Sequence, residues 1–159
     1  IMPFIAAKIG ITMAIATIIL TVSHIFSSLL QPLFGYFADN IVKRSFIFWG
    51  LILSSIFIPL SALAHNPFIL VLFIIFGSIG SSLFHPQALG FVSKFADKEN
   101  TGKAMAVFVA MGTLGYSFGP IISSAITQFL GMPRMPLMTI LGILWAFLMF
   151  ALSILPSTI

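Results

Sequence analysis

Two histidines and a glutamine lie inside apolar segments of this chain, where strongly polar side chains are costly. His24 and Gln31 belong to one apolar run and His85 to another. In a bilayer such groups turn toward the protein interior or a wet cavity, because hydrocarbon leaves them unsatisfied. Histidine also changes charge near neutral pH. These residues therefore favour a pathway for a substrate or a proton, with a hydrogen-bonded structural role as the alternative.

The first of these runs carries a regular polar stripe. Its small and polar residues recur at alternating steps of four and three, which predicts one narrow helix face. The interpretation differs along the stripe: the hydroxyls suit backbone bonding at a helix contact, whereas the histidine and glutamine suit a pathway. The stripe consists of Gly10, Ala14, Thr17, Thr21, His24, Ser28, Gln31 and Gly35.

The second histidine shares a predicted helix face with small residues. Gly77, Ser81 and His85 are spaced by four, and Gly80 lies in the same run of small residues. Such a run lets another helix backbone approach closely. Pro86 removes a backbone donor directly after the histidine and loosens the helix there. The pattern predicts a close helix contact beside a functional histidine.

A further apolar segment carries glycines on one face. Gly112, Gly115 and Gly119 lie on it, and Pro120 follows the last of them. Glycines spaced by four are common in ordinary membrane helix packing. Tyr116 could stack on a substrate, although packing is its commoner role. We expect this face, like the glycines before the second histidine, to let helices pack or rock with little obstruction.

The composition requires a membrane around these segments. The chain has 159 residues, of which 60% are hydrophobic and 6% charged, and a mean hydropathy of +1.20. Soluble domains carry roughly 25% charged residues, and about 20 apolar residues cross a bilayer core. We therefore predict an all-α integral membrane bundle of about five transmembrane helices. Its spans are about 10–38, 46–64, 67–95, 103–130 and 136–155, and residues 1–9 are expected to end a preceding helix and its loop.

Basic residues give the predicted sidedness and exclude other classes of protein. One set of loops holds Lys43, Arg44, Lys94, Lys98 and Lys103, and the opposite side holds Lys8 and Arg134. The first set belongs in the cytoplasm. The sequence has no basic tract of the kind that binds nucleic acid. With no cysteine, and with three histidines on separate segments, we expect no metal, no cofactor and no catalytic residues. A membrane enzyme is therefore disfavoured.

A stretch from Gly35 to Arg44 resembles the loop signature of the major facilitator superfamily. That signature reads G-x-L-A-D-R-x-G-R-R and joins transmembrane helices 2 and 3 on the cytoplasmic side. Asn40 stands where the signature has a basic residue, and Val42 stands where it has a turn glycine. The matching positions are Gly35, Ala38, Asp39 and Arg44, and Lys43 keeps the charge.

Two other stretches strengthen the resemblance. Gly115, Gly119 and Pro120 look like the helix 5 signature of facilitator-type antiporters. The run that ends at Pro86 is similar to helix 4 of fosmidomycin-resistance-type efflux transporters. In those proteins an acid commonly follows the proline, whereas Gln87 stands here.

The resemblance implies that the five segments are helices 2 to 6 of the N-terminal half of a twelve-helix carrier. Its partners would be membrane lipid, a small-molecule substrate and the second half of the same protein. It implies a secondary active transporter in a plasma membrane, the inner membrane in bacteria. Such a carrier works by alternating access, here as proton-coupled efflux of a drug or an anionic metabolite. The alternatives are a facilitator-type uptake carrier and a non-transporting channel or structural subunit.

The same resemblance assigns roles to individual residues. Asp39, with Lys43 and Arg44, would act as a cytoplasmic latch after Gly35. The substrate and proton pathway would be lined by the central-cavity residues, with one histidine as a candidate proton relay: His24, Gln31, His85, Gln87 and Tyr116.

Overall fold

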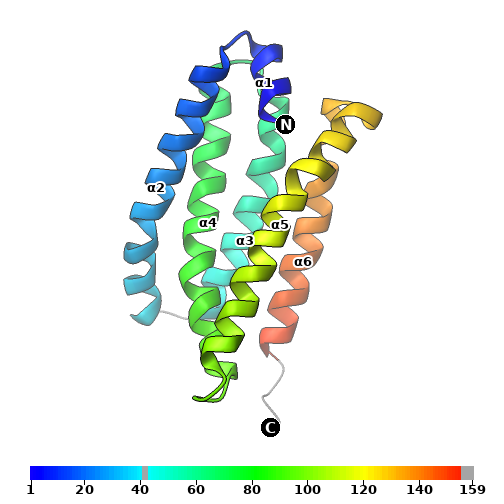
Figure 1. Cartoon of the computed structure of the whole chain (residues 1–159). Helices are drawn as coiled ribbons and strands as arrows, with labels where there is room; N and C mark the ends of the chain where they lie inside the picture. The colour runs from blue at the N-terminus through cyan, green and yellow to red at the C-terminus, as the bar shows by residue number, and fades with distance from the viewer. Residues whose placement is uncertain (41–42, 155–159) are drawn as a thin grey trace.

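The computed structural model of the protein is a bundle of long helices (Figure 1). It describes residues 1–40 and 43–154, except for the side chains of residues 38–40, 43–44, 94–95 and 152–154. The chain forms α1 (Met2–Ile9), α2 (Met13–Asn40) and α3 (Lys43–Leu60), followed by the short 3-10 helix η1 (Ser61–Leu63). It continues with α4 (Pro67–Phe95), α5 (Thr101–Leu130), the 3-10 helix η2 (Met132–Arg134) and α6 (Leu137–Ile154).

Five of these helices, α2 to α6, are long and apolar enough to cross a membrane. The bounds of α4 coincide with the predicted span, and the other helices differ from their predicted spans by a few residues at their ends. α2 begins three residues later than predicted, because Gly10 ends α1 in the left-handed conformation with a φ of 73°. Glycine adopts this conformation without steric cost. Gly10 was predicted to begin the polar stripe. This prediction is wrong, because Gly10 lies before α2.

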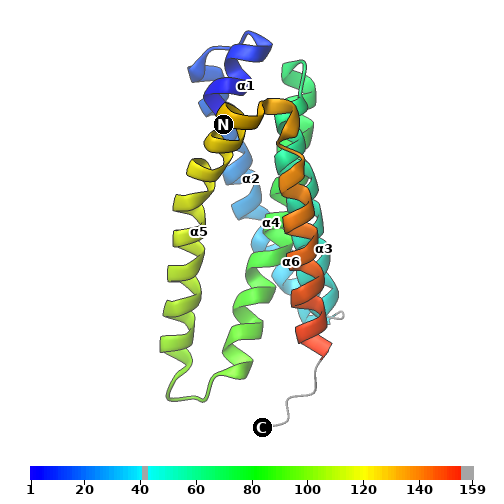
Figure 2. The same ribbon diagram turned by 90° about the vertical axis from the view of Figure 1, so that its right-hand side faces the viewer.

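The helices alternate in direction (Figures 1 and 2). α2, α4 and α6 run one way, and α3 and α5 run the other way. Lys8 and Arg134 lie at the end of the bundle that carries α1, η1 and η2, while Lys98 and Lys103 lie at the opposite end, where α4 passes into α5. The two groups of basic residues are therefore separated as the predicted sidedness requires.

α3 packs against α4 at very short range. A Cβ atom added to Gly50 would lie 2.8 Å from the carbonyl oxygen of Gly80, and one added to Gly80 would lie 2.6 Å from the backbone nitrogen of Ser54. The hydroxyl of Ser54 also donates to the carbonyl oxygen of Gly77 at 3.0 Å. Backbone contact of this kind is the usual reason for glycine at membrane helix interfaces.

α6 packs on the other side of α3. A Cβ atom at Gly142 would overlap the side chain of Ser55, so these two helices also approach closely. Phe48 of α3 contacts both Phe147 and Phe150 of α6, with ring centroids 5.3 and 5.1 Å apart. α3 is therefore held between α4 and α6 by small residues and aromatic rings.

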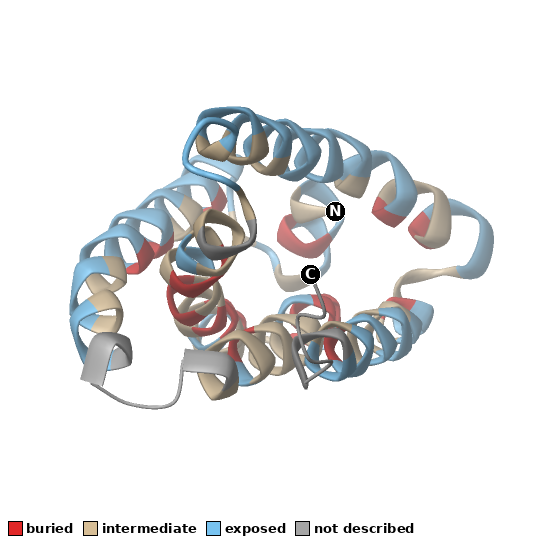
Figure 3. Cartoon of the chain, turned by 90° about the horizontal axis from the view of Figure 1, so that it is seen from below, coloured by how far each residue is buried: buried red, intermediate tan, exposed pale blue. Residues whose placement is uncertain are grey.

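α5 is the least covered of the five long helices. It contacts α4 near the loop that joins them and η2 at its other end. Ser123 and Thr127 are its buried residues. Seen from below, buried residues gather along α4, which contacts both α2 and α3, while α5 is exposed along most of its length (Figure 3).

Candidate functional site

The interface between α2 and α4 is polar. Ser27, Ser82 and Gln87 are buried there, and Ser23 is buried one helical turn before Ser27 on the same face of α2. The hydroxyl oxygens of Ser27 and Ser82 lie 2.9 Å apart, which links the two helices directly. The amide of Gln87 donates to the carbonyl oxygen of Phe34 at 3.5 Å. Gln87, predicted to line the pathway, therefore lies in the helix interface.

The predicted pathway residues lie on one side of this interface. A right-handed helix turns by about 100° per residue. His24 follows Ser23 and is thus rotated by about 100° from the contact face of α2, while His85, three residues after Ser82, is rotated by about 60° in the opposite sense on α4. Because the two helices run in the same direction, opposite rotations lead to the same side of the pair.

Exposure agrees with this placement. His24, Ser28 and His85 are exposed, and Gln31 and Ser81 are half-buried. We call this surface, formed by His24, Ser28, Gln31, Ser81 and His85, the open flank. It combines two polar stretches that are fifty residues apart in the sequence. Thr17 and Thr21 of the stripe are also exposed, and the Thr17 hydroxyl donates to the carbonyl oxygen of Met13 at 2.8 Å.

The helix rise gives the depth of each residue along the bundle. At about 1.5 Å per residue, Gln31 lies about 6 Å beyond Ser27, and His85 lies about 4.5 Å beyond Ser82. Since Ser27 and Ser82 are in contact, Gln31 and His85 lie at nearly the same depth. His24 lies about 9 Å from that depth, toward α1.

The open flank can donate and accept hydrogen bonds without a fixed negative charge. Imidazole and amide groups each offer both functions, and hydroxyls add more. The five membrane spans contain no aspartate or glutamate. Within the described part of the chain, no group of three metal-binding side chains comes together. The surface therefore suits reversible binding of a polar or anionic small molecule.

The other predicted site residues lie away from the open flank or outside the described side chains. Gly77 and Gly80 lie in the contact with α3, and a Cβ at Gly35 would lie 3.8 Å from the Cβ of Pro86. Tyr116 on α5 is 75% exposed. The latch residues Asp39, Lys43 and Arg44 have side chains outside those that the structure describes.

The glycine face of α5 has no neighbour among the described residues. A Cβ atom added to Gly112, Gly115 or Gly119 would meet no atom within 4 Å. Pro120 lies within the same helix, next to the last of these glycines. The roles in packing and rocking that the sequence suggests for this face therefore stay predictions.

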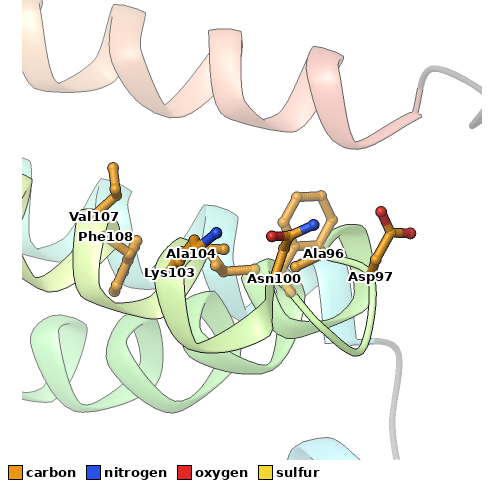
Figure 4. Close-up of a pocket in the computed structure, with 9 residues that line it drawn as sticks. Ala96, Asp97, Asn100, Lys103, Ala104, Val107 and Phe108 are labelled. Atoms are coloured by element: carbon orange, nitrogen blue, oxygen red, sulfur yellow. The ribbon is translucent and has the colours of Figure 1, made fainter.

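A separate pocket lies where α4 passes into α5 (Figure 4). Its volume is about 630 Å³. Asp97, Asn100 and Lys103 bring polar groups to it, and Phe91 and Phe108 are among its apolar residues. None of the residues of the open flank lines this pocket, so the two features are distinct.

Comparison with known proteins identifies the class of protein. The Major Facilitator Superfamily model matches residues 1–159, and the chain belongs to this family. It is thus a multi-pass membrane protein, in agreement with its five apolar helices. No solved structure matches the chain significantly.

Two of three curated relatives carry the names of transporters, and one carries the name of a resistance protein. The chain is 31% identical over 125 residues to the fosmidomycin resistance protein of Escherichia coli, covering 78% of this chain and 30% of that protein. It is 30% identical over 128 residues to the "Probable nitrate transporter NarT" of Staphylococcus epidermidis, covering 79% and 33%. It is 26% identical over 147 residues to the riboflavin transporter RibZ of Clostridioides difficile, covering 92% and 32%. The chain spans about a third of the length of these relatives.

Proposed function

We propose that the chain is part of a secondary active transporter that moves a small molecule by alternating access. The observation that carries the proposal is the open flank, where Gln31 and His85 lie at one depth on two parallel membrane helices. Neither side chain has a hydrogen-bond partner among the residues that the structure describes, and polar side chains without such a partner need water or a ligand beside them in a bilayer. A substrate pathway supplies both.

We place the five long helices as helices 2 to 6 of the N-terminal half of a twelve-helix carrier in a plasma membrane, the inner membrane in bacteria. The exposure of α5 supports this placement, because further helices of the whole protein would cover its glycine face. Asp39, with Lys43 and Arg44, would then form a cytoplasmic latch that opens and closes with the transport cycle. Lipid and the second half of the carrier would surround the remaining surface.

We propose efflux of a drug or an anionic metabolite, coupled to protons, as the transport reaction. The five spans contain no acidic side chains. An anionic substrate is therefore favoured over a cationic one, because no fixed negative charge repels an anion there. His24 and His85 are the candidates for carrying a proton, since an imidazole ring can accept a proton at one nitrogen and donate one from the other. The name of the fosmidomycin resistance relative supports a role in drug resistance.

Transport by the full-length protein in inside-out vesicles with an imposed pH gradient tests this function. The probes are fosmidomycin, nitrate and riboflavin, each supplied separately and compared with empty vesicles. We expect gradient-driven flux of at least one anion, and a loss of flux in His85→Gln. His65→Gln is the matched control, because His65 is exposed in the turn between η1 and α4. Flux that does not depend on the pH gradient, or that is unchanged in His85→Gln, would refute proton coupling through this residue.

A further inference from the structure

We propose that Ser27 and Ser82 are positioning residues, whose contact keeps Gln31 and His85 at a common depth on the open flank. This inference rests on the proposed transport function. Neither serine lies on the open flank itself: Ser27 and Ser82 are 6% and 0% exposed. They would act on the substrate only through the two residues that they hold in place.

The contact is reciprocal and involves backbone as well as side chains. The Ser82 hydroxyl oxygen lies 2.9 Å from the Ser27 carbonyl oxygen and 2.8 Å from the carbonyl oxygen of Ser78. The Ser27 hydroxyl lies 3.3 Å from the same Ser78 carbonyl and 2.9 Å from the Ser82 hydroxyl. Each hydroxyl has one proton and two lone pairs, so both serines can donate and accept across the interface.

Hydrogen bonds of this kind set a register that apolar packing leaves loose. Lipid tails are as apolar as leucine, so moving apolar side chains from lipid into a helix contact supplies little driving force. A hydrogen bond, in contrast, fails once its atoms separate beyond about 3.5 Å. A slip of α2 by one residue combines a shift of about 1.5 Å along α4 with a rotation of about 100°, which turns the Ser27 hydroxyl away from Ser82 and breaks the direct contact.

The register at the two serines determines the relative depth of the residues on the open flank. Gln31 lies one helical turn after Ser27, and His85 lies three residues after Ser82. Each serine and its flank residue belong to one continuous helix, so a change of register at the serines changes the depth of Gln31 relative to His85. A substrate that contacts both residues would lose one of the two contacts.

Ser23 provides a matched control on the same helix face. It is buried to a similar extent, with 5% exposure. Its hydroxyl donates to the carbonyl oxygen of Ile19 in its own helix at 2.7 Å. Ser23→Ala thus removes the same atoms from the same interface as Ser27→Ala, but cuts no link between α2 and α4.

Cross-linking tests the positioning independently of transport. The 159 residues contain no cysteine, so Gln31→Cys with His85→Cys gives a defined pair once cysteines elsewhere in the full-length protein are replaced. We expect a short bismaleimide to join the pair rapidly in membranes, and Ser82→Ala or Ser27→Ala to slow the reaction by at least about 5-fold. Ser23→Ala should leave the rate unchanged. Equal rates in all three variants would overturn the proposal.

Transport kinetics test the consequence for the substrate. In the protein with native Gln31 and His85, we expect Ser82→Ala to raise the KM for the transported probe on the order of 10-fold and to change the maximal rate by less than about 2-fold. The double variant Ser27→Ala/Ser82→Ala should match the single variants, because both remove one contact. Additive effects, or a loss of maximal rate with unchanged KM, would refute the positioning role. If the serine variants cross-link more slowly but the protein transports none of the probes, the proposed function is refuted and the positioning role is not.

Discussion

The glycine contact between α3 and α4 leads to a prediction whose size follows from the structure. In Gly80→Ala, the added Cβ would lie 2.6 Å from both the nitrogen and the hydroxyl of Ser54, and 2.7 Å from the carbonyl oxygen of Gly50. Carbon contacts are normally about 3.5 Å or longer. Two of the three neighbours are backbone atoms, which cannot rotate away, so α3 must move outward by roughly 1 Å.

Three contributions determine the change in the free energy of unfolding. Overpacking costs about 1–3 kcal/mol. The outward movement of α3 also breaks the hydrogen bond from Ser54 to Gly77, which costs about 1 kcal/mol. Alanine gains about 1 kcal/mol over glycine in a helix. The net loss of stability in Gly80→Ala is therefore expected to be about 1–3 kcal/mol.

Equilibrium unfolding of the full-length protein in mixed micelles measures this loss. Gly90→Ala is the matched control, because Gly90 lies in the same helix and its Cβ would meet no atom within 4 Å. We expect this variant to be unchanged or more stable by up to about 1 kcal/mol. If Gly80→Ala is as stable as the parent protein, or if both variants lose the same stability, the close packing of α3 on α4 is refuted.

Three further predictions concern the ends of helices and the lipid-facing surface. Asn66 caps α4 by accepting a 2.8 Å hydrogen bond from a backbone N–H, so Asn66→Ala should lose about 1 kcal/mol of unfolding free energy. Asn100→Ala is its control, because Asn100 precedes α5 without a side-chain cap; equal losses would contradict the capping role. Lys8 donates to an η1 carbonyl oxygen at 3.1 Å, so Lys8→Met should lose about 1 kcal/mol and speed proteolysis of α1, and unchanged proteolysis would refute this contact. Trp49 and Trp145 are each 55% exposed on membrane helices, so brominated lipid should quench the fluorescence of both in a variant without other tryptophans; an unquenched residue would mean that protein covers it.

The fold could be predicted from the sequence because apolar length is a strong signal. Runs of about 20 apolar residues have few alternatives to a membrane helix, and the charged and turn residues between them mark the ends. Gly10 was placed in the wrong element because a glycine fits both a helix face and a left-handed cap. A single sequence gives the spacing of such a residue but not its backbone angles.

The helix contacts were harder to predict than the helices. Gly77 and Gly80 were recognised as a close-contact face, but their neighbours Gly50 and Ser54 were not, because spacing within one helix does not say which helix lies opposite. The spacing of Gly50 and Ser54 by four is the signal that could have found them.

The buried serines were missed for a related reason. The predicted stripe contained Ser28, and the second polar face contained Ser81, each one residue away from the buried contact. One residue corresponds to about 100° of helix rotation, so the sequence identified the two polar flanks and missed the interface between them. Only the common direction of α2 and α4 shows that both flanks lie on one side.

The close contact between α3 and α4 also has a consequence for how the chain is made. These helices are neighbours in the sequence, joined by η1 and a short turn, and their glycine contact needs no later segment. The hairpin can therefore close as soon as α4 has left the ribosome and entered the membrane, while α5 and α6 are still being synthesised. α6 then finds α3 already fixed in place, and its Gly142 docks against Ser55. A variant that weakens this hairpin should accordingly reduce the yield of correctly inserted protein.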